Sequence, residues 1–110
     1  LDEVSLSAPT MVRVVRGNEY ESREWQPREF GLGEVRVDAL KAAGAGESAA
    51  IIRGVLAGED GPARRIVLAN AAAALWAAEA VSTLREGVER AEAALTAGKP
   101  RAVLEALKAE

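Results

Sequence analysis

The sequence predicts an α/β domain in which strands come first, helices follow, and the strand part is incomplete. Strand-like segments occupy residues 1–33, and amphipathic helical patterns fill residues 34–110. No alternation of helices with parallel strands is present, and one hairpin is too small a platform for several helices. We therefore predict strands and an edge hairpin followed by about four to five helices, as part of a larger α/β domain.

The strand part is predicted to contain a short strand and a hairpin. Residues 3–6 have a strand-like composition, and Pro9 ends that run. Gly17 and Asn18 form a two-residue turn signal of the kind that closes a tight hairpin. Polar residues on both strands predict that the hairpin lies at an edge, and Pro27 ends it. The expected register places Arg16 opposite Glu19, Val15 opposite Tyr20 and Val14 opposite Glu21.

The helical part is divided by capping residues, Pro and Gly. Thr83 and Glu86 have the spacing of a capping box. Three helices are predicted at residues 38–41, 46–58 and 63–80; the first is closed near Gly44, and the third has Pro62 in its first turn. A fourth helix is predicted from its cap at Thr83 to a stop at Gly98, and a fifth begins at Pro100. The faces expected to be apolar are Ile52, Val55 and Leu56; Val67, Ala71 and Leu75; Leu84, Val88, Ala91 and Leu95; and Val103, Leu104 and Leu107.

The composition excludes several kinds of chemistry. The 110 residues contain no Cys and no His, so there is no disulfide, no thiolate metal site and no histidine base. The net charge of -3 argues against a nucleic-acid partner, and no run is long enough to cross a membrane. A cytoplasmic location is the default expectation. Any chemistry must use carboxylates, Lys, Arg, hydroxyls or backbone groups, and oxygen ligands suit magnesium or calcium.

Two adjacent carboxylates, Asp2 and Glu3, are the first candidate for a functional site. Neighbouring side chains on a strand point to opposite faces, so the pair converges only from a turn or a strand end. Such a pair can hold magnesium against substrate phosphate oxygens. A solvated acidic terminus explains the same residues without any function.

The remaining candidates have structural explanations that are simpler than functional ones. Arg13, Arg16 and Arg23 could grip phosphate, but on an edge hairpin we expect them to face solvent and to pair with the neighbouring glutamates, Glu19, Glu21 and Glu24. Residues 44–46 (Gly-Ala-Gly) precede a helix as an anion-binding turn would, but their spacing matches no phosphate loop, which favours a helix connection.

Asn70 and the two tryptophans are also predicted to be structural. Asn is a poor residue for a helix interior, so Asn70 is expected to cap a neighbouring backbone group across a helix contact. Trp25 and Trp76 are expected to pack in the interior rather than to stack on a ligand.

Four phrases resemble anthranilate phosphoribosyltransferases in the same order along the chain. They are "LDEVSLSAPT" at 1–10, "QPREFGL" at 26–32, "ESAAIIRGVLAGEDGPARRIVLANAAAALW" at 47–76 and "STLREGVERA" at 82–91. The first resembles the family's acidic metal motif, in which a Gly normally precedes the Leu. The departures, Ser48 where Asn is usual and Ala45 within a usual Gly-Gly pair, lie away from that motif.

The resemblance implies that residues 1–110 are the C-terminal portion of a phosphoribosyl pyrophosphate-binding α/β domain. The family transfers phosphoribosyl from phosphoribosyl pyrophosphate to anthranilate in tryptophan biosynthesis. By resemblance, Asp2 and Glu3 hold magnesium against the pyrophosphate, and no nucleophilic residue is required. The family's glycine-rich pyrophosphate loop and its helical domain, which binds anthranilate and forms a homodimer, are not in this sequence. We therefore expect the chain alone to be inactive and to expose apolar surface.

Two alternatives remain open at this point. A pyrimidine nucleoside phosphorylase also has a helical domain beside an α/β domain, and it would act on thymidine with phosphate. A non-catalytic interaction domain would instead stand alone, with a cooperative thermal transition and a discrete oligomeric state.

Overall fold

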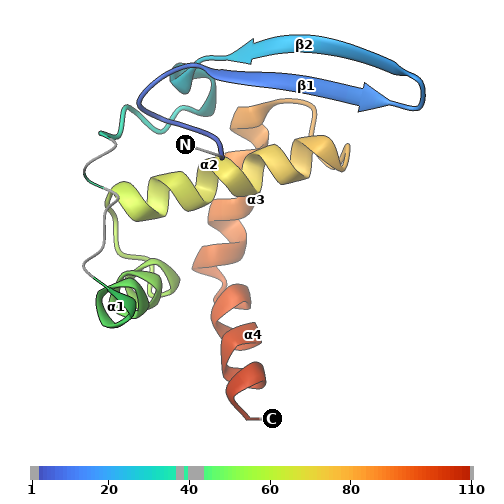
Figure 1. The fold of residues 1–110 in the computed structure, drawn as a ribbon. Helices are drawn as coiled ribbons and strands as arrows, with labels where there is room; N and C mark the ends of the chain where they lie inside the picture. The colour runs from blue at the N-terminus through green and yellow to red at the C-terminus, as the bar shows by residue number, and fades with distance from the viewer. Residues whose placement is uncertain (1–2, 37–38, 40–43, 110) are drawn as a thin grey trace.

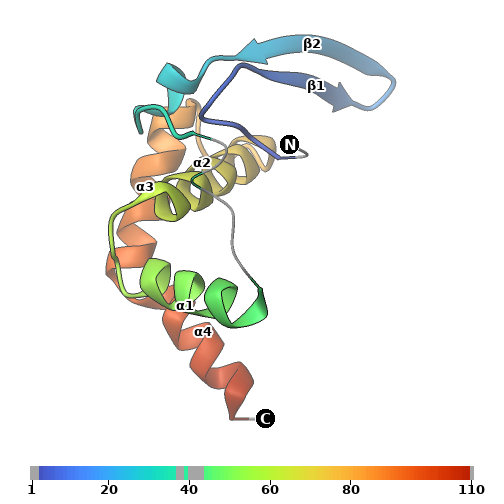
Figure 2. The ribbon, with the colours of Figure 1, turned by 60° about the vertical axis from the view of Figure 1, so that its left-hand side comes forward.

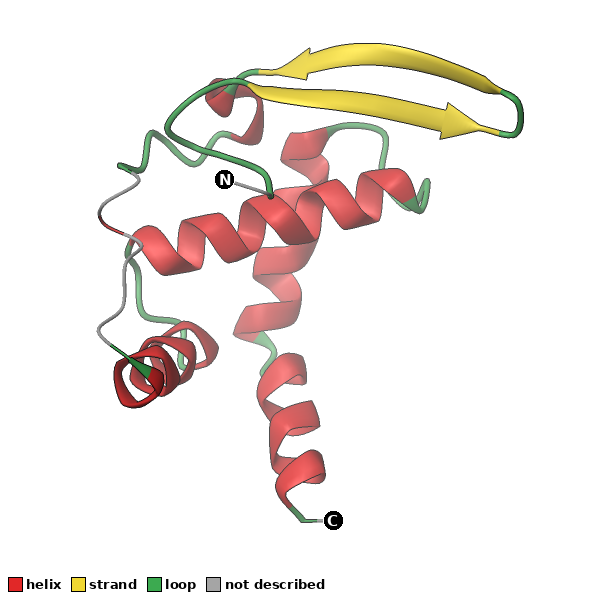
Figure 3. Cartoon of the chain, in the orientation of Figure 1, coloured by secondary structure: helices red, strands yellow, loops and turns green. Residues whose placement is uncertain are grey.

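The computed structural model describes residues 3–36, 39 and 44–109. The chain forms a hairpin, a 3-10 turn and then four α-helices (Figures 1 and 3). The elements are β1 (Thr10–Arg16), β2 (Glu19–Trp25), η1 (Pro27–Phe30), α1 (Ala45–Leu56), α2 (Pro62–Ala77), α3 (Leu84–Thr96) and α4 (Lys99–Lys108). This architecture confirms the predicted edge hairpin followed by helices. Asp38 and Lys41, which bound the first predicted helix, lie outside the described residues.

The hairpin has the register that its turn predicts. Arg16 lies opposite Glu19 and Val14 opposite Glu21 in the antiparallel pair β1–β2. Gly17, the first of the two turn residues, has a φ of 60°, a left-handed value that favours Gly. Every residue of β2 is exposed except Trp25 at its end. In Figure 1 the hairpin lies above α2, with its base beside η1 and its turn near the loop that follows α2, where Arg16 pairs with Glu79.

The strand expected at residues 3–6 is wrong. This segment is irregular because side chains satisfy its first backbone amides, so no ladder with another strand forms. The only backbone pairing of the segment to another part of the described chain is a single hydrogen bond, in which Val35 N–H donates to Leu6 O at 3.1 Å. Val4 and Leu6 are nonetheless buried, at 7% and 0% exposure.

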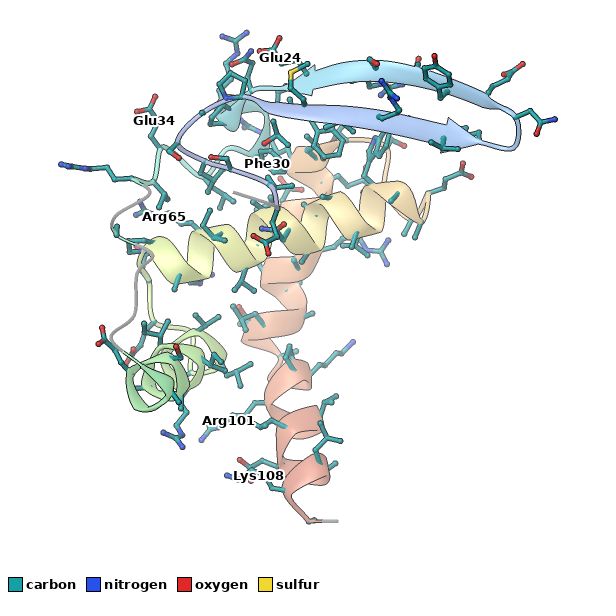
Figure 4. The ribbon with its side chains drawn as sticks, viewed as in Figure 1. Glu24, Phe30, Glu34, Arg65, Arg101 and Lys108 are labelled. Carbon is teal, nitrogen blue, oxygen red and sulfur yellow. The ribbon has the colours of Figure 1, made fainter. Side chains whose placement is uncertain are left out.

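The core lies where α2 crosses α3 beneath η1 and the N-terminal segment (Figure 1). Gly87 on α3 permits this crossing, because a Cβ there would lie 2.9 Å from the Cα and Cβ of Ala72 on α2. Figure 4 shows Phe30 on the side of η1 that faces the helices, and this ring is 1% exposed. The buried residues of the core are Val4, Leu6, Trp25, Phe30, Val35, Leu68, Ala69, Ala72, Leu84, Val88 and Leu95.

The predicted apolar face of α2 is wrong, whereas that of α3 is confirmed. On α2 the buried residues are Leu68, Ala69 and Ala72, and Val67 of the predicted stripe is 48% exposed. The run of Ala in this helix leaves the hydrophobic periodicity too weak to define one face. On α3 the larger residues Leu84, Val88 and Leu95 are buried as predicted, and Ala91 packs half-buried against them.

Capping residues define the helix ends. Thr83 Oγ1 accepts the Glu86 N–H at 3.1 Å, while the Glu86 carboxylate accepts from Ser82 N at 3.2 Å, so the return bond of the predicted box goes to Ser82. Helix α2 ends at Ala77, three residues before the predicted end, because Glu79 adopts a φ of 60°. The Ala80 N–H then bonds to Leu75 O and the Glu79 N–H to Trp76 O, which completes a Schellman motif.

Helices α1 and α4 are the least covered of the four helices in the described chain. Helix α1 lies beyond the N-terminal end of α2, and α4 continues from α3 away from the hairpin (Figure 2). Val55 on α1 is buried as expected, but Ile52 is 55% exposed. On α4, Val103 and Leu107 are 61% and 62% exposed, which agrees with the expectation that the chain alone exposes apolar surface. Among the described helices, none is long and apolar enough to cross a membrane.

Candidate functional site

The N-terminal acidic segment is the candidate site that the structure best defines. Glu3 is exposed, lies in a bend directly before the buried Val4, and forms no ion pair with the other described residues. Asp2 lies outside the described residues. The backbone directly after Glu3 lies beside α2, because the Val4 N–H bonds to Asn70 of that helix.

Asn70 joins this segment to α2. Its Oδ1 accepts the Val4 N–H at 3.1 Å, across 66 residues of sequence. Its Nδ2 donates to Ile66 O, one turn earlier on the same helix, at 3.0 Å. The prediction that Asn70 caps a neighbouring backbone group is confirmed, although that group belongs to the N-terminal segment and not to a helix.

Two further contacts hold the residues that follow Glu3. The Thr10 hydroxyl accepts the Ser5 N–H at 3.0 Å, and Leu6 O accepts the Val35 N–H at 3.1 Å. Sequence reasoning missed Thr10 and Val35, because each bonds a residue whose position depends on the fold. For Thr10 the hydroxyl close after Pro9 was the one available signal, since such hydroxyls often accept from nearby backbone amides. For Val35 the sequence contains no signal.

The arginines of the hairpin do not converge on a phosphate site. Arg23 pairs with Glu21 on its own strand, with Nε 2.6 Å from Oε1. Arg16 reaches Glu79 at 3.1 Å instead of its cross-strand neighbour, because the loop after α2 lies beneath the turn of the hairpin. Arg13 lies over the Tyr20 ring at 4.9 Å. The prediction that these arginines form surface contacts instead of a phosphate site is thus confirmed. The partners of Arg16 and Arg13 are not the glutamates of the hairpin that were predicted.

The tryptophans are packing residues, as expected: Trp25 is buried in the core, and Trp76 is half-buried against it. Trp25 meets Phe30 edge-on at 6.1 Å between ring centroids and Trp76 at 5.4 Å. Arg23 covers the Trp76 ring at 5.0 Å. The glycine-containing turn at residues 44–46 begins α1, with Ser48 N–H donating to Gly44 O at 3.0 Å, which is a helix connection. Neither feature adds a ligand contact.

The donor chemistry of the acidic segment fits magnesium. The segment supplies carboxylate oxygen, which magnesium prefers, together with room for the waters that it retains. In the part of the chain that the structure describes, no group of three metal-ligating side chains exists. The segment can therefore contribute one side of a site whose other ligands are water and substrate oxygens, as magnesium sites at phosphates often are.

The family model described as "Glycosyl transferase family, a/b domain" matches residues 1–101. The chain belongs to this family.

Within the family, the similar proteins are anthranilate phosphoribosyltransferases. That of Thermomicrobium roseum is 50% identical over 98% of this chain and 32% of its own length. That of Symbiobacterium thermophilum is 43% identical over the same shares. The structure of the Thermus thermophilus enzyme aligns with a TM-score of 0.79 and 34% identity, over 96% of this chain and 31% of that one.

A solved structure of a Saccharomyces cerevisiae anthranilate phosphoribosyltransferase variant with Mg bound aligns with a TM-score of 0.85 and 27% identity. The alignment covers 96% of the present chain and 31% of the yeast chain. A further structure of the yeast enzyme, in complex with 4-fluoroanthranilate, aligns with a TM-score of 0.86 at the same identity. The chain thus spans about a third of the length of the relatives that it matches.

Proposed function

We propose that these residues act as part of an anthranilate phosphoribosyltransferase. The observation that carries this proposal is the 50% identity to such an enzyme over 98% of the chain. The whole enzyme transfers phosphoribosyl from phosphoribosyl pyrophosphate to anthranilate, uses magnesium and assembles as a homodimer. We expect the 110-residue chain by itself to be inactive, because its sequence contains no glycine-rich pyrophosphate loop.

In the proposed reaction, the bond between the anomeric carbon and the pyrophosphate oxygen breaks, and pyrophosphate leaves with the bonding electrons. The anthranilate nitrogen forms the new bond to that carbon and loses a proton. Bound magnesium supplies charge neutralisation for the pyrophosphate. Asp2 and Glu3 are the residues of this chain that hold the metal, and the exposed carboxylate of Glu3 is available for it.

The test is a hybrid enzyme. In it, these 110 residues replace the matching segment of the Thermomicrobium roseum enzyme, and anthranilate fluorescence is followed with phosphoribosyl pyrophosphate and magnesium. We expect a loss of fluorescence that depends on all three components, and none from the 110-residue chain alone. A thermal transition measured by circular dichroism verifies that the hybrid enzyme is folded.

The same hybrid enzyme tests the competing assignment. Phosphorolysis of thymidine with inorganic phosphate is measured by the absorbance of the released base. A folded hybrid enzyme that consumes thymidine and leaves anthranilate untouched would overturn the proposal in favour of a nucleoside phosphorylase. A folded hybrid enzyme that is inert with both substrate pairs would contradict any catalytic role for these residues.

A further inference from the structure

We propose that Asn70 is a positioning residue for the magnesium-holding carboxylates, acting through the peptide group between Glu3 and Val4. This inference rests on the proposed function, since it assumes that Glu3 binds the metal. Asn70 itself touches neither metal nor substrate in this proposal. It determines where the backbone beneath Glu3 lies relative to α2.

The hydrogen bond from Val4 N–H to Asn70 Oδ1 acts on the peptide group that adjoins Glu3. The Val4 nitrogen belongs to the same planar peptide unit as the carbonyl of Glu3, so the 3.1 Å bond to Asn70 Oδ1 orients that whole unit. The bonds at Ser5 and Leu6 lie further along the chain and do not involve the Glu3–Val4 peptide. Asn70 is therefore the described side chain that bonds the peptide adjoining Glu3.

The Asn70 amide is itself held in one orientation. Nδ2 donates to Ile66 O at 3.0 Å, which leaves Oδ1 directed at the Val4 N–H. The opposite orientation of the amide would place two donors against each other at Val4 and two acceptors against each other at Ile66. The side chain is also half-buried, so its surroundings restrict it further.

The choice of Asn at this position runs against the needs of the helix. Ala occupies the positions on both sides, at Ala69 and across residues 71–74. Ala has the highest helix propensity and Asn is among the poorer residues, so α2 alone would be more stable with Ala at position 70. A residue that breaks the local preference needs a role elsewhere in the fold. The described structure provides one, the bond to the acidic segment.

The test compares two variants of the hybrid enzyme. Asn70→Ala removes the acceptor and keeps a good helix former, so the variant is expected to fold. Val88→Ala is the matched control, because Val88 is 5% exposed in the same core and its aliphatic side chain cannot form a hydrogen bond to the acidic segment. Glu3→Gln is the reference for loss of a metal ligand, and it reports on the proposed function independently of Asn70.

Three measurements are made on each variant. Binding of Mn²⁺ is followed by the electron paramagnetic resonance signal of the free ion. Deuterium exchange is followed by mass spectrometry on a peptide that covers residues 3–6. The rate of anthranilate consumption is measured as a function of magnesium concentration.

For Asn70→Ala we expect the Mn²⁺ dissociation constant and the magnesium concentration for half-maximal rate to rise at least about tenfold, as for loss of other residues that orient metal ligands. Saturating magnesium should restore most of kcat, and exchange at residues 3–6 should accelerate. For Val88→Ala we expect a lower melting temperature with metal binding unchanged.

The outcomes separate the two ideas. If Glu3→Gln weakens Mn²⁺ binding while Asn70→Ala matches the Val88→Ala control, Asn70 has no positioning role and the inference is wrong. If Glu3→Gln leaves Mn²⁺ binding unchanged, the proposed metal role of Glu3 fails, and the inference falls with it.

Discussion

Single residues decide where the helices of this chain begin and end. The Thr83 hydroxyl accepts the Glu86 N–H at the start of α3, and Glu79 adopts a left-handed φ of 60° after the end of α2. Glu79 also pairs with Arg16 at 3.1 Å, but both side chains are more than 60% exposed, so this pair contributes little to stability. The cap is worth more than the ion pair, because it satisfies a backbone donor that the helix leaves unpaired.

Replacement of the cap tests this ranking. Thr83→Ala should lower the free energy of unfolding by about 1 kcal/mol, since the Glu86 N–H loses its acceptor. Chemical denaturation of the hybrid enzyme measures the change. Thr96→Ala, at the exposed C-terminal end of α3, is the control and should change stability by less than about 0.5 kcal/mol. Equal losses in the two variants would show that the cap bond has no special weight.

At the scale of elements, the crossing of α2 over α3 supports both the core and the acidic segment. The same helix α2 buries Leu68 and Ala72 against its neighbours and presents Asn70 to Val4. The absence of a side chain at Gly87 allows α3 to lie this close to α2. Any shift at this crossing moves the helix that carries Asn70.

Gly87→Ala tests the closeness of the crossing. The new Cβ would lie 2.9 Å from backbone and side-chain atoms of Ala72, and such overpacking costs about 1–3 kcal/mol. Ala is also a better helix former than Gly by roughly 1 kcal/mol, so the net loss of stability is expected to be about 0–2 kcal/mol.

Gly46→Ala on α1 is the matched control, because no atom lies within 4 Å of its added Cβ. Thermal unfolding of the two hybrid-enzyme variants is compared. We expect Gly46→Ala to be neutral or stabilising. A Gly87→Ala variant as stable as the Gly46→Ala control would mean that the crossing is looser than the structure shows.

At the scale of the whole molecule, the chain is less compact than a self-contained domain of its size. The radius of gyration is 15.0 Å, with extents of 43 × 30 × 23 Å, whereas a compact domain of this length has about 13 Å. The extension comes from α4 and from the tip of the hairpin (Figure 2). Ile52, Val103 and Leu107 are each more than half exposed on helices whose periodicity predicts burial.

The exposed apolar face of α4 predicts that the chain by itself associates with further copies at micromolar concentrations. Val103 and Leu107 lie one helical turn apart, so replacing both by Lys should shift the sedimentation distribution toward monomer. The control is a second double variant, Thr96→Lys with Ala97→Lys, which adds the same charge at exposed positions at the end of α3. Equal shifts in both double variants would assign the effect to charge and not to the α4 face.

Local patterns in the sequence predicted much of the fold and a smaller part of the candidate site. The two-residue turn at Gly17 determines the hairpin register, and Thr83 and Pro62 mark helix starts, because each of these signals acts within a few residues. The carboxylate pair at Asp2 and Glu3 was visible as two adjacent ligand types. For the bonds that hold the segment after Glu3, the sequence indicated that Asn70 caps a backbone group, but it did not indicate that this group is Val4 N–H.

By itself, then, the sequence determined the hairpin, the helix boundaries near caps and prolines, and the kinds of ligand available at the N-terminal segment. Only the tertiary structure decided which face of α2 is buried, that Arg16 meets Glu79, and that Asn70 meets Val4. The physical reason is the distance along the sequence between the residues that interact. Turns and caps are satisfied by neighbours in the chain, whereas burial and long-range hydrogen bonds depend on which elements cross, and the run of Ala in α2 leaves that choice to its partners.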